Sequence, residues 1–110
     1  MNVTFLRSKV QRVCNSEKSL RGKYGDRMTE KIQVRLATLA QVETLAEMRL
    51  LPGRCHELTG DWAGHLALDL VHPQRLIFCP NHDPVPRTKE GSLIWELVTE
   101  VSIVVIADYH

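Results

Sequence analysis

The stretch HLALDLVHPQRLIFC, residues 65–79, decides the fold because its apolar residues alternate with other types. A period of two is typical of a strand with one buried face, and it predicts that three leucines face the core: Leu66, Leu68 and Leu70. Val71–Gln74 contains a proline and predicts a turn, after which Arg75–Cys79 predicts the returning strand. The stretch therefore predicts a β-hairpin.

Further strands are expected on both sides of this hairpin. Arg54–Leu58 predicts a strand before it, and Val98–Ile106 predicts the last strand. The run Ile103–Ile106 shows no alternation, which is expected of a strand covered on both faces. Residues 80–92 contain three prolines and a glycine among charged side chains, so we expect a surface loop there.

The chain begins with the pattern of a strand followed by a helix. Met1–Leu6 predicts a short first strand. Ser8 and Gln11 have the spacing of a capping box, in which each side chain covers an exposed N–H group at a helix start. Apolar residues then recur at helical spacing, so this helix is expected to run to about Arg21.

A second helix is expected after two glycines. Gly22 and Gly25 should end the first helix, and Asp26 can cap the next one. The second helix carries an apolar stripe that consists of Met28, Ile32, Leu36 and Leu39. Thr44–Met48 predicts a last helical turn before a proline and a glycine. Two N-terminal helices packed on a mostly antiparallel, twisted sheet make an α+β fold.

Length and composition limit the class of protein. At 110 residues, the chain is expected to form a single domain over residues 1–110. No apolar run approaches the roughly 20 residues that cross a bilayer. Met1–Leu6 is too short for the apolar core of a secretory signal. We therefore expect a cytoplasmic protein that does not bind membranes.

The net charge is only +1, but positive and negative side chains are unevenly distributed. Residues 1–35 hold nine Lys and Arg residues against three acidic ones, whereas the other 75 residues hold five basic and ten acidic side chains. This asymmetry is typical of a basic face for nucleic acid. We take Lys23, Arg27 and Lys31 as RNA-binding candidates, although two solvated helix faces would give the same pattern.

Three cysteines occur, and none forms a CxxC motif. The odd number of cysteines is best explained if each one is a small, apolar, buried residue and not part of a disulfide. A zinc site from Cys55, His56 and Cys79 stays open, but its spacing matches no common ligand pattern, so no metal or cofactor is expected. Most histidines are expected at the surface or in turns, and His65 and His72 are noted because they flank the hairpin.

Three motifs together resemble a known family. They are the turn Gly60–Gly64 with the sequence GDWAG, the strand Arg75–Phe78, and the terminal triplet Asp108-Tyr109-His110. In this order and spacing they are similar to RelE/HigB toxins of bacterial type II toxin–antitoxin systems. These toxins form part of the RelE/ParE superfamily, which includes plasmid maintenance killer proteins. The resemblance extends over nearly the whole chain.

The resemblance implies an endoribonuclease that cleaves messenger RNA on the ribosome without a metal or cofactor and so inhibits translation. It also implies a helix-turn-helix antitoxin as partner, with operator DNA bound only through the antitoxin complex. In this chemistry the 2′-hydroxyl attacks the adjacent phosphate. Such a reaction needs a proton acceptor, a cation for the pentavalent phosphorane and a proton donor for the leaving oxygen.

Carried over from the family, the catalytic candidates are Arg75, Tyr109 and His110. Arg75 offers a bidentate fork to phosphate, although a surface arginine paired with Asp69 or Glu100 is the plain alternative. His110 suits a general acid, and the alternative is a frayed chain end. Tyr109 is a candidate hydrogen-bond donor, proton relay or base stacker, or else a core residue.

Two positions depart from the family pattern. Trp62 stands where many of these toxins carry arginine, and Val105 stands where a polar, often acidic residue is common. Trp62 and His65 are RNA-binding candidates, and the lost cation at residue 62 is expected to attenuate activity. The alternatives are a ParE-like inhibitor of DNA gyrase and a non-catalytic module that binds the antitoxin. A Tyr–His end favours the nuclease, because inhibition of gyrase needs no general acid.

Overall fold

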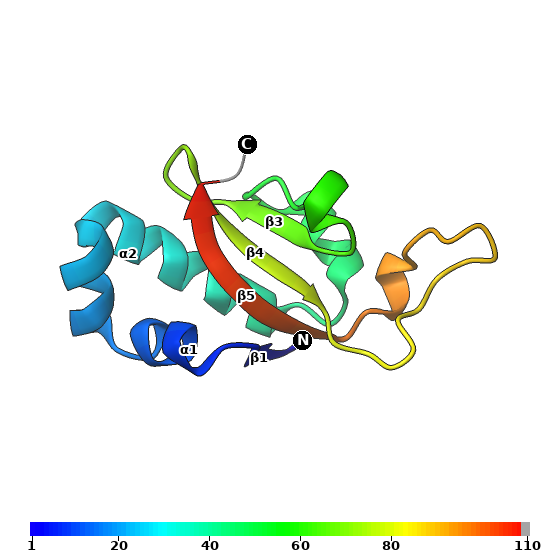
Figure 1. Ribbon diagram of the computed structural model, residues 1–110, viewed down its shortest axis with the longest axis horizontal. Helices are drawn as coiled ribbons and strands as arrows, with labels where there is room; N and C mark the ends of the chain where they lie inside the picture. The colour runs from blue at the N-terminus through cyan, green and yellow to red at the C-terminus, as the bar shows by residue number, and fades with distance from the viewer. Residues whose placement is uncertain (109–110) are drawn as a thin grey trace.

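The computed structural model describes residues 1–108, and Tyr109 and His110 lie outside the described residues. Figure 1 shows the helices and strands coloured along the chain from the N-terminus to the C-terminus. In the text, η denotes a short 3₁₀ helix. The elements are β1 (Asn2–Phe5), α1 (Ser8–Cys14), α2 (Glu17–Gln41), η1 (Leu45–Leu50), β2 (His56–Glu57), η2 (Gly60–Trp62), β3 (Leu66–Asp69), β4 (Gln74–Pro80), η3 (Trp95–Leu97) and β5 (Glu100–Asp108).

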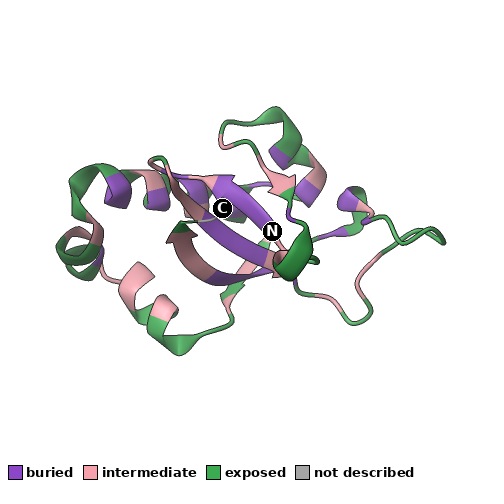
Figure 2. Ribbon diagram, turned by 45° about the horizontal axis from the view of Figure 1, so that its top comes forward, coloured by how far each residue is buried: buried purple, intermediate pink, exposed green. Residues whose placement is uncertain are grey.

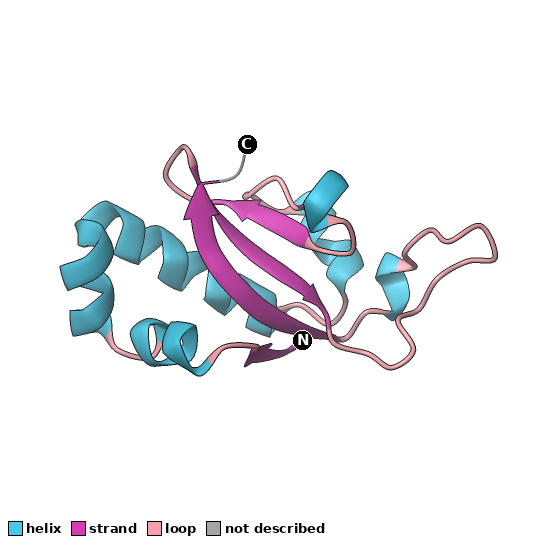
Figure 3. Cartoon of the chain, in the orientation of Figure 1, coloured by secondary structure: helices cyan, strands magenta, loops and turns pink. Residues whose placement is uncertain are grey.

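Within residues 1–108, five strands form one sheet in the order β1-β5-β4-β3-β2. β1 pairs with β5 in parallel, and every other neighbouring pair is antiparallel. Figure 3 shows the long strands curving together in one layer. The predicted hairpin is β3–β4, with Leu66 opposite Phe78 and Leu68 opposite Leu76. The expected α+β class with a mostly antiparallel sheet is confirmed.

One face of the sheet and α2 enclose the main core. The buried residues of β3 and β4 on this face pack with Leu20, Met28, Ile32 and Leu39 of α2. Figure 2 shows the buried residues along the central strands and on one side of α2. The predicted stripe is confirmed, with Leu36 only partly buried beside it. Full burial of each such side chain stabilises the fold by about 1.5–3 kcal/mol.

The opposite face of the sheet carries a second, smaller apolar cluster. Its buried members are Leu58, Ala67 and Ile77, and Trp62, Val105 and Ala107 pack against them half-buried. A β-bulge separates the two ends of the β4–β5 pair, because Ile77 lies opposite Val105 but Phe78 lies opposite Ile103. The bulge leaves Val104 as an extra residue in β5. It keeps Ile77 and Val105 on the small cluster while Phe78 and Ile103 face the main core.

The break predicted at the two glycines is present at Gly25, but an earlier break between α1 and α2 was not predicted. α1 ends at Cys14, and Ser16 caps α2 by accepting a hydrogen bond from the Ser19 backbone N–H group at 3.1 Å. Gly22 is helical, since glycine is tolerated inside a helix at a modest cost in stability. Gly25 does interrupt α2, with a φ of 81° and a ψ of 172° that produce a kink.

The capping box predicted at the start of the first helix is also wrong. Arg7 is the N-cap of α1, and no side chain caps this helix. A capping box instead begins η1, where the Glu47 carboxylate accepts the Thr44 backbone N–H at 3.0 Å. This hydrogen bond lowers the pKa of Glu47, together with a second one from Glu43. The helical turn expected near Thr44–Met48 is confirmed as η1.

Strand ends differ from the predictions in two places. The sequence predicts a strand over Arg54–Leu58, but β2 covers only His56–Glu57. Arg54 has a φ of +49°, which excludes it from the strand. β5 begins and ends two residues later than Val98–Ile106. Its expected burial on both faces holds as far as Val104, and Val105 onwards is only half-buried or exposed. No helix among the described residues has the length and apolarity to span a membrane.

The loop between β4 and β5 extends away from the sheet (Figure 1). It carries an isolated bridge between Arg87 and Leu93. Its start is fixed to β5 by His82, whose Nε2 accepts the backbone N–H groups of Thr99 and Glu100 at 3.1 and 3.3 Å. The surface loop expected at residues 80–92 is therefore present, and the hydrogen bonds of His82 hold its first turn against the start of β5.

Gly53 lies where the chain passes closest to α2. Its φ of +117° is rarely adopted by residues with a side chain. A Cβ atom there would lie 2.9 Å from Arg35 Nε and 3.0 Å from Leu68 Cδ2. Arg35 is buried, and its Nε donates to the Asp69 carbonyl at 2.9 Å, so it cannot move aside freely.

We therefore expect Gly53→Ala to lower the free energy of unfolding by about 2–4 kcal/mol, from backbone strain and overpacking together. Urea unfolding followed by circular dichroism measures this loss. Gly91→Ala is the matched control, because Gly91 has a φ of +91° but nothing within 4 Å of its added Cβ. Equal losses in the two variants would show that the contact with Arg35 does not constrain residue 53.

Candidate functional site

Arg75 lies near the start of β4, opposite Asp69 of β3 on one side and Ala107 of β5 on the other. It shares a sheet face with Ile77, as the period of two predicts. Its Nε lies 3.2 Å from Asp69 Oδ1, and its side chain is only 15% exposed. The geometry of this contact is that of an ion pair rather than a hydrogen bond. The ion pair with Asp69 that the sequence left open is thus present.

Asp69 is the centre of this site. Its carboxylate accepts two hydrogen bonds from Arg54, from Nε at 3.0 Å and from Nη2 at 3.3 Å. Its backbone N–H donates to the Gly53 carbonyl at 2.7 Å, and its own carbonyl accepts from Arg35 Nε. Three arginines, from α2, β4 and the segment before β2, therefore meet at one residue.

The charges around Asp69 outweigh the effect of its burial. Partial burial disfavours the ionised carboxyl group, but the hydrogen bond from Arg54 and the charges of Arg75, Arg54 and His56 favour it more. The pKa of Asp69 is consequently lower than its usual value. The carboxylate is ionised at neutral pH, and each neighbouring guanidinium keeps a fixed anionic partner.

Arg54 and Arg35 were not identified from the sequence as site residues. Arg54 lies 15 positions before Asp69, and Arg35 lies 34 positions before it, so no short motif joins them. Arg35 is buried in α2, where a charged side chain is not expected from the sequence. The dipeptide Pro52–Gly53 was the one local signal, since a glycine in a tight bend permits a close approach of the backbone.

Trp62 and His65 form a pair on the same sheet face as Arg75. Their rings meet edge to face, with centroids 5.2 Å apart and an angle of 89° between the planes. His65 Nδ1 donates to the Trp62 carbonyl at 3.2 Å, which fixes the orientation of the imidazole. Trp62 also packs against the small cluster that includes Ile77 and Val105. The turn does present residue 62 to the hairpin that carries Arg75.

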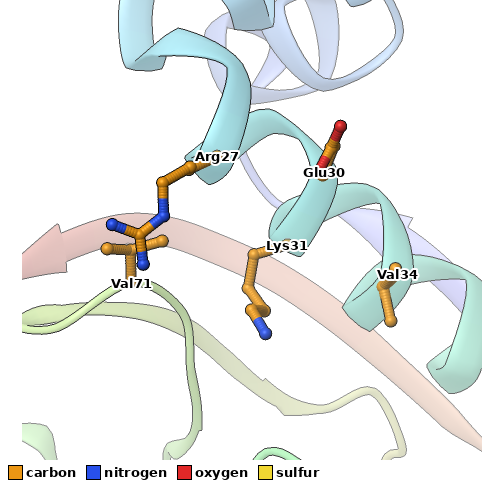
Figure 4. Close-up of a pocket in the computed structure, with 5 residues that line it drawn as sticks. All are labelled: Arg27, Glu30, Lys31, Val34 and Val71. Carbon is orange, nitrogen blue, oxygen red and sulfur yellow. The ribbon is translucent and has the colours of Figure 1, made fainter.

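The basic residues of α2 lie on the other side of the sheet. Arg27 and Lys31 line a pocket of about 290 Å³ with Glu30, Val34 and Val71. Figure 4 shows both cationic side chains extending from α2 toward the turn that carries Val71, while Glu30 points away. This turn leads directly into β4 and Arg75. Arg27 and Lys31 therefore approach the hairpin that carries Arg75 from the helix side.

Lys23 does not share this pocket. Its Nζ lies 5.5 Å from the centre of the Tyr24 ring, and it lines a smaller pocket with Cys14 and Ile106. The three basic residues predicted to bind RNA thus divide into a pair, Arg27 and Lys31, and the separate Lys23. A charge count along the chain cannot make this distinction.

Tyr109 and His110 lie outside the described residues. The last described residues of β5 are Ala107 and Asp108, which lie opposite Arg75 and Gln74. The catalytic candidates at the C-terminus therefore follow in the chain directly after the segment of β5 that pairs beside Arg75. Their roles stay predictions.

Within residues 1–108, no group of three or more His, Cys, Asp or Glu side chains forms a candidate metal site. The three cysteines are unpaired. Burial raises the pKa of Cys55 to about 12, and it also raises the pKa values of Cys14 and Cys79. These thiols stay protonated at neutral pH. All three cysteines are half-buried, so the full burial expected from the sequence is not observed.

No family model matches the sequence, and no curated protein sequence matches it either. Solved structures that share the fold include a toxin and a protein complex. A YoeB/ParE toxin from Agrobacterium tumefaciens has 14% sequence identity and a TM-score of 0.57, with all of both chains covered. A YoeB–YefM complex from Staphylococcus aureus has 15% identity and a TM-score of 0.56, covering 100% of this chain and 97% of that one. The chain thus has the fold of RelE/ParE-like toxins, as its resemblance implied.

The lowered pKa of Asp69 predicts a stability difference that depends on pH. Its stabilising effect is complete above the unfolded pKa of about 3.9 and is lost as the pH falls through the lower folded value. We expect Asp69→Asn to be less stable than the wild type at pH 7 by on the order of 1 kcal/mol, since solvent screens the half-buried pair. Urea unfolding at decreasing pH should show this gap closing.

The control for this measurement is Asp61→Asn. Asp61 is exposed and forms no ion pair within the part of the chain that the structure describes. Its replacement should leave stability nearly unchanged across the same pH range. A gap between Asp69→Asn and the wild type that persists at the lowest pH would contradict an electrostatic role for Asp69.

Proposed function

We propose that this chain is a RelE/HigB-like toxin of a type II toxin–antitoxin system and that it cleaves messenger RNA on the ribosome. The likeness in fold to YoeB/ParE toxins supports the class of protein. The observation that carries the nuclease assignment is the register of β5. It puts Ala107 opposite Arg75, two residues before Tyr109 and three before His110.

The proposed reaction is attack of a ribose 2′-hydroxyl on the adjacent phosphate. Arg75 would stabilise the charge of the phosphorane, since a guanidinium stays protonated at any working pH and binds phosphate oxygens in a bidentate manner. His110 would protonate the leaving 5′-oxygen, and Tyr109, as a proton relay, would pass the proton of the attacking 2′-hydroxyl to solvent water. No cofactor enters this scheme, because these side chains supply the cation and the protons.

Binding of the ribosome and messenger RNA is assigned to the basic side chains. Arg27 and Lys31 gather two positive charges in a pocket beside the hairpin turn, and Lys23 adds a third along the same helix. On the other sheet face, the half-buried Trp62 and His65 offer aromatic rings to RNA bases. Affinity should therefore fall as the salt concentration rises.

The proposed partner is a helix-turn-helix antitoxin, which would carry the toxin to operator DNA. The Staphylococcus aureus neighbour was solved as a complex of YoeB with YefM, and this supports a protein partner for the same fold. Plasmid maintenance is the biological setting that the resemblance implies, and the cytoplasm, where the ribosomes are, is the proposed location.

Two other functions are compatible with this fold. A ParE-like inhibitor of DNA gyrase would need neither the charge of Arg75 to stabilise a phosphorane nor His110 for proton transfer. A non-catalytic module that binds the antitoxin would use Arg75 only as the structural partner of Asp69, which is the pairing observed. Primer extension on cellular messenger RNA after induction separates the three. Cleavage at codons supports the nuclease, supercoiling defects alone support the gyrase inhibitor, and neither effect supports the binding module.

We expect Arg75→Ala to reduce cleavage strongly, by about 10²–10³-fold, while binding of the whole ribosome, to which many other basic side chains contribute, changes little. The reason is that its charge matters most when the phosphorane forms. Single-turnover cleavage on programmed ribosomes and ribosome pelleting measure the two effects separately, and His110→Ala should give a comparable loss. Arg87→Ala removes an equal charge from the distant loop and serves as the control. If Arg75→Ala weakens binding and leaves cleavage unchanged, Arg75 is a docking residue.

We expect Trp62→Arg to increase growth inhibition, because a guanidinium at this position would restore a phosphate contact. A charge-assisted hydrogen bond of about 1.5–3 kcal/mol corresponds to a rate increase of roughly ten- to a hundredfold. Growth curves of the wild type, Trp62→Arg and Trp62→Ala under one inducible promoter measure this. If Trp62→Ala loses activity and Trp62→Arg gains none, the indole acts as a base-stacking surface and does not attenuate the toxin.

A further inference from the structure

Arg54 and Arg75 approach the same carboxylate from two different segments of the chain. Arg54 Nε and Nη2 bind the two oxygens of Asp69, and Arg75 Nε lies 3.2 Å from Oδ1. Contact with one carboxylate places the two guanidinium groups side by side. Two arginines and one aspartate carry a net charge of +1, and the buried Arg35 behind them raises it to +2. The cluster therefore has a net positive charge even when the negative charge of Asp69 is counted.

The bonds to Asp69 leave donors of both arginines available. The Arg54 side chain is 60% exposed, and its Nη1 group forms no hydrogen bond with residues 1–108. Arg75 likewise forms no hydrogen bond with these residues, although its Nε is buried against Asp69. A guanidinium has five N–H donors, so each arginine keeps an edge that can bind a second anion.

The backbone of Arg54 is held in an uncommon conformation. Its φ of +49° makes it the one residue other than glycine with a positive φ in the part of the chain that the structure describes. Such a conformation is strained, and it persists only where the surroundings enforce it. His56 Nδ1 donates to the Arg54 carbonyl at 2.7 Å, and Gly53 precedes it in the close bend against Arg35. These contacts restrain the backbone of Arg54 and fix its position beside Asp69.

We propose that Arg54 and Arg75 together bind one RNA phosphate, with Asp69 as the positioning residue that holds their guanidinium groups side by side. This inference rests on the proposed function and extends it. It adds Arg54, which lies outside the family motifs, as a second phosphate-binding arginine. It also explains why an acidic residue, Asp69, lies at a site that binds phosphate.

A carboxylate at an anion site needs a physical reason. The guanidinium groups of Arg54 and Arg75 repel each other when both contact one carboxylate. An arginine side chain also loses considerable conformational freedom when it is fixed in one place. Asp69 compensates for both costs before the phosphate arrives, so the phosphate meets donors that are already oriented. Simple charge counting gives the opposite expectation, because removal of a negative charge should strengthen the binding of any anion. The sign of the effect at residue 69 therefore separates positioning from general electrostatics.

The test is the binding of a fluorescent 2′-O-methyl octaribonucleotide, which has no 2′-hydroxyl and so cannot be cleaved. Fluorescence anisotropy at several salt concentrations gives the affinity and its salt dependence. We expect Arg54→Gln to weaken binding by about ten- to a hundredfold. The slope of log affinity against log salt should fall by about 0.7, the loss of one phosphate contact on a single strand. Asp69→Asn should also weaken binding, several-fold, despite its more positive charge.

Two variants in the distant loop match these changes in charge. Arg87→Gln removes one positive charge, and Glu90→Gln removes one negative charge; both residues are exposed. We expect Arg87→Gln to weaken binding by less than twofold and Glu90→Gln to leave it unchanged or slightly tighter. Thermal unfolding of each variant verifies that it is folded, and Arg54→Gln tests the site even if Asp69→Asn unfolds.

The outcomes distinguish this inference from the proposed function. An oligonucleotide affinity of Arg54→Gln equal to that of Arg87→Gln overturns the second phosphate contact. Tighter binding by Asp69→Asn overturns the positioning role, and a wild type that does not bind the oligonucleotide at low salt overturns the site as a whole. Messenger RNA cleavage by the wild type in cells, measured by primer extension, reports on the proposed function independently of these results.

Discussion

The half-buried residue Asp69 connects the segments of the chain that carry the three arginines of the candidate site. It lies at the end of β3 and pairs with Arg75 of β4 and with Arg54 before β2, while its carbonyl accepts from Arg35 of α2. Asp69 thereby fixes the hairpin, the strand beside it and the long helix relative to one another. The spacing of all three guanidinium groups depends on this residue.

Most of the fold could be predicted from the sequence, because it rests on local periodicity. Leu66 and Leu68 face the core as their spacing requires, and Gly25 interrupts α2. The boundary at Asn15 could not be predicted, since a helix may pass through Gly22 at modest cost and the Ser16 cap was not distinguished from other polar residues. Local patterns identify the elements well, whereas their ends depend on contacts distant in the sequence.

Less of the candidate site could be predicted, and the reason is the same. Arg75 was found through the family motif, and its face of the sheet followed from the period of two. Arg54 and Arg35 were missed because their partner is Asp69, far along the chain, and because a positive φ at a non-glycine residue has no sequence signature. The separation of Lys23 from Arg27 and Lys31 likewise depends on the kinked path of α2.

The parallel pairing of β1 with β5 determines the order in which the molecule can fold. Asn2 lies opposite Glu100, so β1 can pair with β5 only after about 100 further residues have been synthesised. Synthesis proceeds at about 5–20 residues per second, which leaves β1 and the outer side of β4 without a neighbour for several seconds. The β3–β4 hairpin can form early because its contacts are local, but the strand beside Arg75 arrives last. The face of the sheet that carries Arg75 therefore takes its final form only when β5 has joined β4, after the hairpin is complete.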